Sequence, residues 1–281
     1  MAFLGPNELW ISADRRSKWT YDPGAGTVTL YVEGTAVFNA TSSSFTALVE
    51  TIQQGGGSVA TNTAYGDNAL DSNTTGASNT AIGDEALTAN TTGASNTAVG
   101  ASALDANTTG ASNTAIGAAA LGAETTGVNN VAVGKDALLV QVGATGNVAI
   151  GKSAGDALST GSNNALVGLD AGGALTTGAS NVAVGKDALL SATTGAQNVA
   201  VGATALDAAT TAVDNTAVGF NALGAVTTGV NNTAVGSGAL AAATTSTGNT
   251  AVGKTAADAV PTGVNNTAGG VDALGAETPG I

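Results

Sequence analysis

Along most of this chain, one pattern of small apolar and polar residues repeats every 17 residues. From Asn62 an asparagine recurs at every 17th position as far as Asn266, which makes thirteen copies. A glycine stands four residues after each asparagine and an alanine seven residues after it, in all thirteen copies. Recurrence of this kind within one chain indicates a repeat architecture whose stacked units share a core. The second and third units carry these positions as Asn79, Gly83, Ala86, Asn96, Gly100 and Ala103.

Each unit predicts one short β-strand, because between asparagine and glycine most units read Thr or Val, then Ala, then Val or Ile. A unit of 17 residues is too short for a helical hairpin, since helical repeats need about 33 residues or more. Side chains alternate between the faces of a strand. We therefore expect Thr63 and Tyr65 to lie on one face and Ala64 on the other, with equivalent columns along the stack.

The invariant columns predict how the coils stack. Strands in a sheet lie about 4.8 Å apart, so thirteen coils predict a rod on the order of 60 Å long. We expect the glycine to occupy a left-handed or crowded turn position. We expect the asparagines to form an amide ladder, each bonding to its copies above and below. The prediction is a tandem β-solenoid of thirteen coils over residues 62–281.

One coil alone buries too few apolar side chains to offset the conformational entropy lost when its backbone is ordered. Both faces of the Thr-Ala-Val strand are apolar or small, so one can line the interior of the coil while the other packs against another chain. This pattern favours a tight oligomer.

The first 45 residues differ from the repeats and hold both tryptophans of the chain. The run over residues 27–41 is rich in β-formers, with Glu33 and Gly34 as a turn between two strands. These features predict a small β-rich domain over residues 1–45. Residues 45–54 have the apolar spacing of a short amphipathic helix, and glycines follow it. We therefore expect a helix and a glycine-rich linker over residues 46–61.

Composition excludes several kinds of function. The net charge is −13 and charged residues are only 10% of the chain, which disfavours nucleic-acid binding. Cysteine and histidine are both absent, so thiolate chemistry, the most common general base and the most common metal ligand are missing. Asp84 and Glu85 are the one candidate pair of catalytic carboxylates. Adjacent residues on a turn are poorly placed for glycoside hydrolysis, because its two carboxylates must lie on opposite sides of the cleaved bond. We predict that the protein is not an enzyme and uses no cofactor or metal.

The sequence contains no run of 18 apolar residues, and its start lacks the basic and apolar regions of a secretory signal. We therefore expect no membrane insertion, and we expect release from the cell by lysis rather than by secretion.

The most variable repeat positions lie five and six residues after each asparagine, where a solvent-facing turn is expected. Lys135, Lys152, Lys186 and Phe220 stand there, either as a contact surface or as ordinary surface residues that aid solubility. Paired threonines such as Thr74 and Thr75 recur in most units and raise the alternative of an ice-binding surface.

A second candidate surface lies in the N-terminal region, where basic and aromatic residues are concentrated. It is a candidate docking site for an acidic partner, and the alternative is a solvated turn. Its residues are Trp10, Arg15, Arg16, Lys18 and Trp19.

The unit Asn-Thr-Ala-Val-Gly-x-x-Ala-Leu resembles the head repeats of trimeric autotransporter adhesins and similar repeats of phage tail fibres and virion proteins. The resemblance covers residues 62–281. It implies a left-handed parallel β-roll and a homotrimer packed around a threefold axis. The chain departs from the autotransporter pattern because it shows no signal peptide, heptad stalk or membrane anchor, which favours a phage origin.

The resemblance implies a trimeric tail fibre or other surface appendage of a phage particle. The N-terminal domain would dock onto a capsid or tail protein, and the β-roll shaft would contact a glycan or protein of the host surface. The alternatives are a capsid decoration protein, and a bacterial adhesin or ice-binding solenoid. Location on the virion surface, and outside the cell after lysis, follows from the leading reading.

Overall fold

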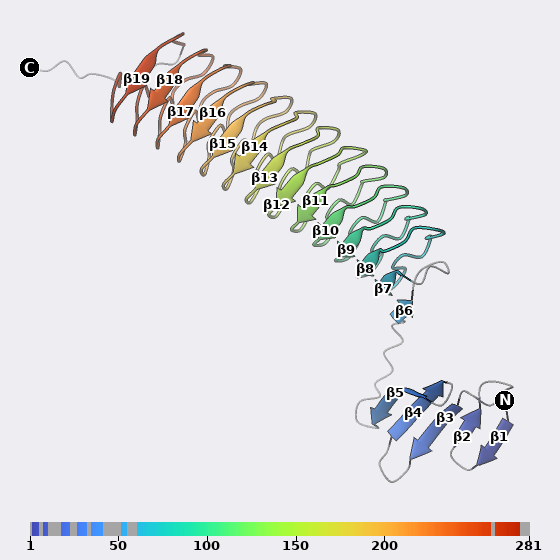
Figure 1. Cartoon of the computed structure of the whole chain (residues 1–281). Coiled ribbons are helices and arrows are strands. Elements are labelled where there is room, and N and C mark those ends of the chain that lie inside the picture. Colours follow the sequence, from blue (N-terminus) through green and yellow to red (C-terminus); the bar gives the residue numbers. More distant parts are fainter. Residues whose placement is uncertain are drawn as a thin grey trace, which may run out of the picture. The chain divides into compact units, whose positions relative to one another are not determined.

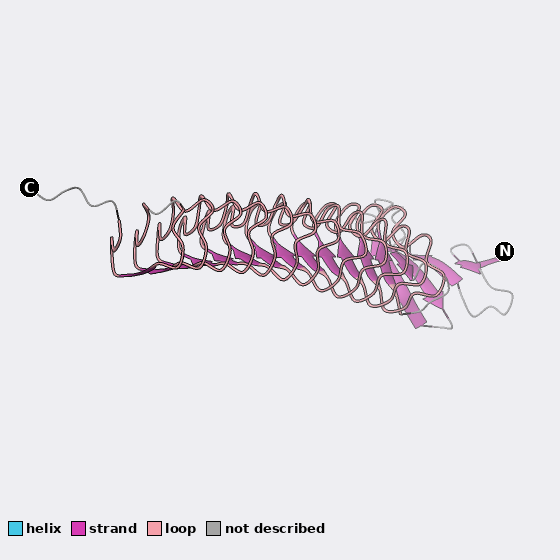
Figure 2. Cartoon of the chain, turned by 90° about the horizontal axis from the view of Figure 1, so that it is seen from above, coloured by secondary structure: helices cyan, strands magenta, loops and turns pink. Residues whose placement is uncertain are grey.

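The computed structural model describes six short N-terminal strands together with residues 61–259 and 262–275. The chain divides into two compact units, Met1–Thr51 and Ile52–Ile281. The described residues contain strands and turns but no helix (Figure 2), so the predicted all-β class is confirmed.

The first unit contains a five-stranded antiparallel sheet with the strands in sequence order. Its strands are β1 (Ala2–Gly5), β2 (Glu8–Trp10), β3 (Lys18–Asp22), β4 (Thr27–Val32) and β5 (Thr35–Thr41). The strands β4 and β5 pair with each other and are separated by Glu33 and Gly34, in agreement with the two strands predicted on either side of these residues.

The segment that follows differs from its prediction. Ile52–Gln54 forms strand β6, which pairs antiparallel with the first strand of the solenoid. The helix expected over residues 45–54 is therefore wrong for its last three residues, and residues 45–51 lie outside the described part. The physical reason is that the first coil has no coil before it, and β6 supplies hydrogen-bond partners to its exposed edge.

The second unit is a parallel β-solenoid with one strand in each of thirteen coils, as predicted (Figure 1). Each strand is three residues long and begins 17 residues after the last one. The strands are β7 (Thr63–Tyr65), β8 (Thr80–Ile82), β9 (Thr97–Val99), β10 (Thr114–Ile116), β11 (Val131–Val133), β12 (Val148–Ile150), β13 (Ala165–Val167), β14 (Val182–Val184), β15 (Val199–Val201), β16 (Thr216–Val218), β17 (Thr233–Val235), β18 (Thr250–Val252) and β19 (Thr267–Gly269).

Equivalent residues of successive coils lie side by side, so repeat columns become straight rows on the solenoid. Ala98, for example, pairs with Ala81 on one side and Ala115 on the other. The middle residue of every strand is buried and its neighbours are half-buried or exposed, which confirms the predicted alternation. The interior is filled by this alanine row, by the invariant alanine row and by the leucine row next to it.

The glycine row limits how close the coils can lie. Gly100 has φ +136, and a Cβ there would lie 2.6 Å from the carbonyl oxygen of Gly117 in the next coil. Gly83 has the same φ, and its Cβ would lie 2.5 Å from the carbonyl oxygen of Gly100. Any side chain would force the coils apart, so the predicted need for glycine is confirmed on both grounds, backbone angle and crowding.

Each coil also turns at left-handed positions that carry ordinary residues. In the coil that begins at Asn96 these are Ser102 (φ 52), Leu104 (φ 52) and Ser112 (φ 59). The left-handed region costs an L-residue about 1–2 kcal/mol. Leu104 is fully buried, and burying a leucine returns about 1.5–3 kcal/mol. The leucine row is therefore stable because packing offsets its backbone strain.

The predicted amide ladder is present, and the backbone takes part in it. The backbone N–H of Asn96 donates to Oδ1 of Asn79 at 2.9 Å, and Oδ1 of Asn96 accepts from the backbone N–H of Asn113 at 3.0 Å. Nδ2 of Asn96 donates to the carbonyl of Gly110 at 2.8 Å. In later coils Nδ2 also reaches the previous asparagine, as from Asn232 to Oδ1 of Asn215 at 3.0 Å. These buried amides therefore join each coil to the next.

One leucine fills the space of two missing ones. Gly155 and Gly172 stand in the leucine row, where ten other coils carry leucine. The middle of β13 carries Leu166 where the other strands of the stack carry alanine. A Cβ on Gly155 would lie 2.6 Å from Cδ1 of Leu166, and a Cβ on Gly172 would lie 2.9 Å from its Cδ2. The interior volume is thus conserved although its residues have changed places.

We predict that Leu166→Ala destabilises the solenoid by about 2–5 kcal/mol, because a cavity between two glycines cannot collapse onto another side chain. The denaturation midpoint measures this effect. The matched control is Gly155→Leu with Gly172→Leu and Leu166→Ala, which restores the common pattern and should recover most of the loss. A single Leu166→Ala variant with an unchanged midpoint would show that the leucine does not fill this space.

Candidate functional surfaces

A second buried polar row crosses the first coils, eleven residues after each ladder asparagine. Nδ2 of Asn90 donates to Oδ1 of Asn73 at 2.9 Å, and Nδ2 of Asn107 donates to Oδ1 of Asn90 at 2.8 Å. The next coils place Glu124 and then Gln141 in this row, and from Leu158 onward the described members are apolar. This row therefore changes from polar to apolar between the fifth and the sixth coil, while the asparagine ladder stays polar throughout.

The carboxylate of Glu124 accepts hydrogen bonds from its own coil and from the next coil. Its Oε1 accepts backbone N–H groups from Thr125, Thr126 and Gly127 of its own turn, at 2.8, 3.0 and 2.6 Å. It also accepts the N–H of Gly143 in the next coil at 2.8 Å. The side chain is fully buried. The carboxylate thereby satisfies three backbone N–H groups of its own Thr-Thr-Gly turn and one N–H group of the next turn, where Val142 and Gly143 replace the threonine pair.

Gln141 links the side chain of Glu124 to the asparagine ladder by hydrogen bonds. Its Nε2 donates to Oε2 of Glu124 at 2.8 Å, and its Oε1 accepts from Nδ2 of Asn147 in the main ladder at 2.8 Å. On the other side of Glu124, Oδ1 of Asn107 is buried without a partner. The coil above Asn107 places an acid where an amide would be, so no side-chain NH₂ group continues the row.

We predict that Glu124→Ala lowers the unfolding free energy by several kcal/mol, because each buried N–H left without an acceptor costs about 1–3 kcal/mol. The control is Glu124→Gln, whose amide oxygen can still accept from the turn and which should lose less. Chemical denaturation measures both variants. Equal midpoints for Glu124→Ala and the wild type would refute this role of the carboxylate.

The outer side of the strands forms a surface of mostly β-branched residues, threonine, valine and isoleucine, which we call the strand face. It consists of the first and third residues of β7–β19. The third residue is valine or isoleucine in most coils, and Ile82, Ile116 and Val252 are 39%, 41% and 49% exposed. No other segment among the described residues covers this surface. A regular, flat row of β-branched side chains is suited to packing against another protein surface.

The candidate contact residues of the solenoid share one row, at the turn that follows each strand. Lys135, Lys152, Lys186 and Phe220 are all exposed, and Phe220 is 62% exposed. The structure therefore brings them onto one edge, in agreement with the turn expected there.

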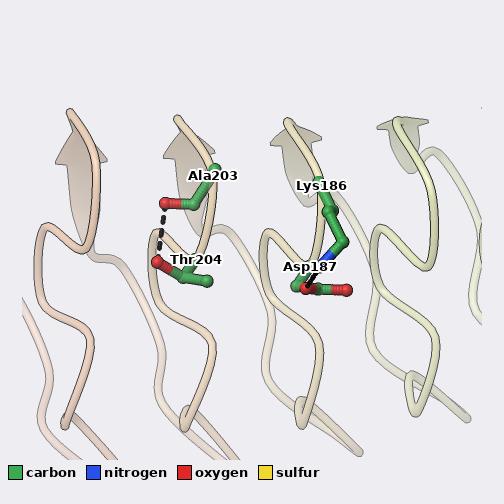
Figure 3. Close-up of polar contacts among 4 residues, drawn as sticks. All are labelled: Lys186, Asp187, Ala203 and Thr204. Carbon is green, nitrogen blue, oxygen red and sulfur yellow. Dashed lines mark hydrogen bonds and ion pairs between the residues drawn. The ribbon is translucent and has the colours of Figure 1, made fainter.

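Two of these lysines are paired within their own coil. Lys135 forms an ion pair with Asp136, and Nζ of Lys186 lies 2.6 Å from Oδ2 of Asp187 (Figure 3). The hydrogen bond and the charge of Asp187 raise the pKa of Lys186. Exposed pairs of this kind add little stability. They do reduce the net positive charge that this edge presents to a ligand.

The paired threonines do not form a two-residue-wide surface. The hydroxyl of the first threonine is used within the stack, as where Oγ1 of Thr91 donates to the carbonyl of Thr108 at 3.0 Å. The second threonine, such as Thr92, is exposed. The exposed row is therefore one threonine wide, and Val142 and Gly143 interrupt it.

The adjacent carboxylates Asp84 and Glu85 lie at the surface of the solenoid. Asp84 and Glu85 are exposed on a turn, and the hydroxyl of Ser102 lies 3.4 Å from Oε2 of Glu85. Across the described ranges, no group of three or more acidic side chains is arranged to hold a metal ion.

The residues that stand nine positions after each ladder asparagine form a row whose pattern repeats over more than one coil. From the third coil this row repeats Asp, then Gly, then a third residue every three coils, and the third residue is leucine in the first two copies and Ala241 in the next. Its aspartates Asp105, Asp156, Asp207 and Asp258 are 51 residues apart. Burial raises the pKa of Asp105, Asp156 and Asp207, partly opposed by backbone hydrogen bonds. Sequence reasoning based on the 17-residue period missed this feature, although the 51-residue spacing is visible once the coils are aligned.

These aspartates predict a pH dependence. Because their folded-state pKa values lie above 3.8, the folded protein binds more protons than the unfolded chain at pH values around and above 3.8. Their contribution to stability therefore falls as pH rises through this window. We expect the triple Asp→Asn variant at these positions to unfold at a higher temperature than the wild type at pH 7. The difference should vanish below pH 3.8, and a variant less stable at pH 7 would contradict the expectation.

The N-terminal candidates are only partly within the described residues. Trp10 ends β2 and pairs with Lys18 at the start of β3, and Trp19 pairs with Leu9. Arg15 and Arg16 lie outside the described residues. The structure thus places Trp10 and Lys18 opposite each other on neighbouring strands.

Comparison with known proteins identifies no relative. No protein-family model, no curated protein and no solved structure matches the chain. Within the described ranges, no helical segment has the length and hydrophobicity needed to cross a bilayer.

Proposed function

We propose that this protein is a homotrimeric structural and adhesive protein of a phage particle, a tail fibre or similar surface appendage without catalytic activity. The observation that supports the proposal is the uncovered strand face, which has the same period as the solenoid itself. In the proposed trimer the coils are left-handed, the strand faces meet around the threefold axis, and the turns remain outside.

The strand face is best matched by a second copy of the same chain. The side chains of the strand face repeat with every coil. A partner whose side chains have the same spacing can pack against them along the whole length of the face. A strand rises about 3.3 Å per residue, and neighbouring coils lie about 4.8 Å apart. A face three residues wide and thirteen coils long therefore covers an area on the order of 600 Å². That is close to the roughly 800 Å² that each partner buries in a stable interface.

The remaining parts supply attachment and adhesion in this proposal. The N-terminal residues Trp10, Arg15, Arg16, Lys18 and Trp19 dock onto a capsid or tail protein. The exposed row of Lys135, Lys152, Lys186 and Phe220 contributes host contacts. Three parallel chains present each weak contact three times, which raises the overall affinity through avidity.

We predict a solution mass of three times 26.4 kDa by light scattering. Val184→Lys combined with Val235→Lys should lower the mass, because buried lysines on the strand face would repel one another. Thr194→Lys with Thr245→Lys places the same charge on the exposed threonine row and should leave the mass unchanged. A monomeric mass for the wild-type protein would contradict the proposed trimer.

The virion location has a separate test. Immunogold labelling of particles from a culture that produces the protein should place label on the phage tail or capsid. Label on the bacterial surface alone would contradict the phage assignment and favour a bacterial adhesin.

A further inference from the structure

The strand face changes in polarity along its length, and the change lies in the first residue of each strand. This residue is threonine in β7–β10 and again in β16–β19. In the strands between them, β11–β15, the first residue is apolar. We call these five residues the valine block: Val131, Val148, Ala165, Val182 and Val199.

The valine block lies at the centre of the strand face. Ala165 begins β13, the seventh of the thirteen strands, and four strands that begin with threonine follow on either side of the block. The third residues of β11–β15 are valine or isoleucine, so both columns of the face are apolar here. Ile150 and Val184 are 41% and 38% exposed, and the block residues are half-buried. Part of each side chain is therefore left for contact with a partner.

The strand face also carries no charge. The chain has 20 acidic and 7 basic residues, but none of them is a first or third residue of β7–β19. Depletion of charge, with an apolar centre and a more polar surround, is the composition of an interface between proteins. The threonines at both ends of the face supply that surround.

A strictly periodic face does not fix which coils of two chains lie at the same height. A partner displaced by one whole coil would meet the same spacing of side chains, so the register is only weakly specified. Displaced contacts also fail to close into a ring, and their repetition builds an open filament. A closed homotrimer with this face therefore needs a feature that distinguishes one coil from another.

We propose that the valine block fixes the register of the parallel chains in the homotrimer. In register, the five layers of the block contain no hydroxyl from the first column. Each threonine layer contains three hydroxyls, which can bond to one another because a hydroxyl both donates and accepts.

A displaced chain breaks this match at both ends of the block. Displacement by one coil brings Thr114 of one chain level with Val131 of its neighbour, and Thr216 level with Val199. A hydroxyl buried against valine methyl groups has no hydrogen-bond partner, which disfavours the displaced arrangement. The favoured partner is a second copy of the chain, because a copy has the same change of polarity at the same height. The inference rests on the proposed homotrimer and names the residues that align its chains.

The test is co-expression of the wild type with a shifted variant, each carrying a different affinity tag. The shifted variant moves the apolar block by two coils without changing the composition, and its substitutions are Val131→Thr, Val148→Thr, Thr216→Val and Thr233→Val. Native mass spectrometry counts the mixed oligomers. We expect fewer than about a tenth to be mixed, against about three quarters for random mixing of three chains.

The matched control makes the same kinds of change away from the strand face. All of its positions are exposed on other sides of the coils, and its substitutions are Val140→Thr, Val142→Thr, Thr160→Val and Thr177→Val. This variant should mix randomly with the wild type.

The shifted variant expressed alone should have the same mass as the wild type, because its own blocks match one another. If it fails to fold, a variant shifted in the opposite direction takes its place. The substitutions of this second variant are Val182→Thr, Val199→Thr, Thr97→Val and Thr114→Val.

Random mixing of the shifted variant with a trimeric wild type would overturn the role of the valine block and leave the trimer in place. A monomeric wild type would overturn both. A wild type that assembles with another number of chains, and still separates from the shifted variant, would overturn only the trimer and support the block.

Discussion

The close approach of successive backbones at the glycine row is the constraint on which the solenoid depends. With a Cβ excluded at Gly100 and its copies, each coil can lie close enough to the next for the strands to pair in register. The asparagine ladder acts over the same short distance, because its amides reach only one coil away. Two polar or side-chain-free columns thus hold together a solenoid whose buried apolar side chains are mainly alanine and leucine.

Within that frame the interior tolerates changes that keep its volume filled and its polar groups paired. Leu166 replaces two leucines from a different row, and Glu124 accepts backbone N–H groups from its own turn and from the irregular turn of the next coil. The buried row changes from asparagine to leucine without any change in coil spacing in sequence. The identity of an interior residue matters less than whether it fits between the coils above and below it.

Regular stacking inside also makes the outside periodic, and the proposed functions follow from that periodicity. Residues 17 positions apart become neighbours on the strand face, while the half-buried aspartates Asp105, Asp156 and Asp207 recur only every 51 residues. A surface with the period of the coil suits a second copy of the chain. The proposed assembly and adhesion both depend on many weak contacts in fixed spacing rather than on one deep pocket.

The amino-acid sequence by itself determined the coil length, the strand positions, the alternation of side chains along each strand and the asparagine ladder, because each follows from a period that is local and repeated. Tertiary structure decided what depends on contacts between different columns. Ile52–Gln54 became a strand because it lies beside the open edge of β7, which its own apolar spacing did not indicate. The roles of Leu166 and Glu124 likewise arise from the coils above and below them, since a side chain's neighbours across the stack are set by how the chain is wound.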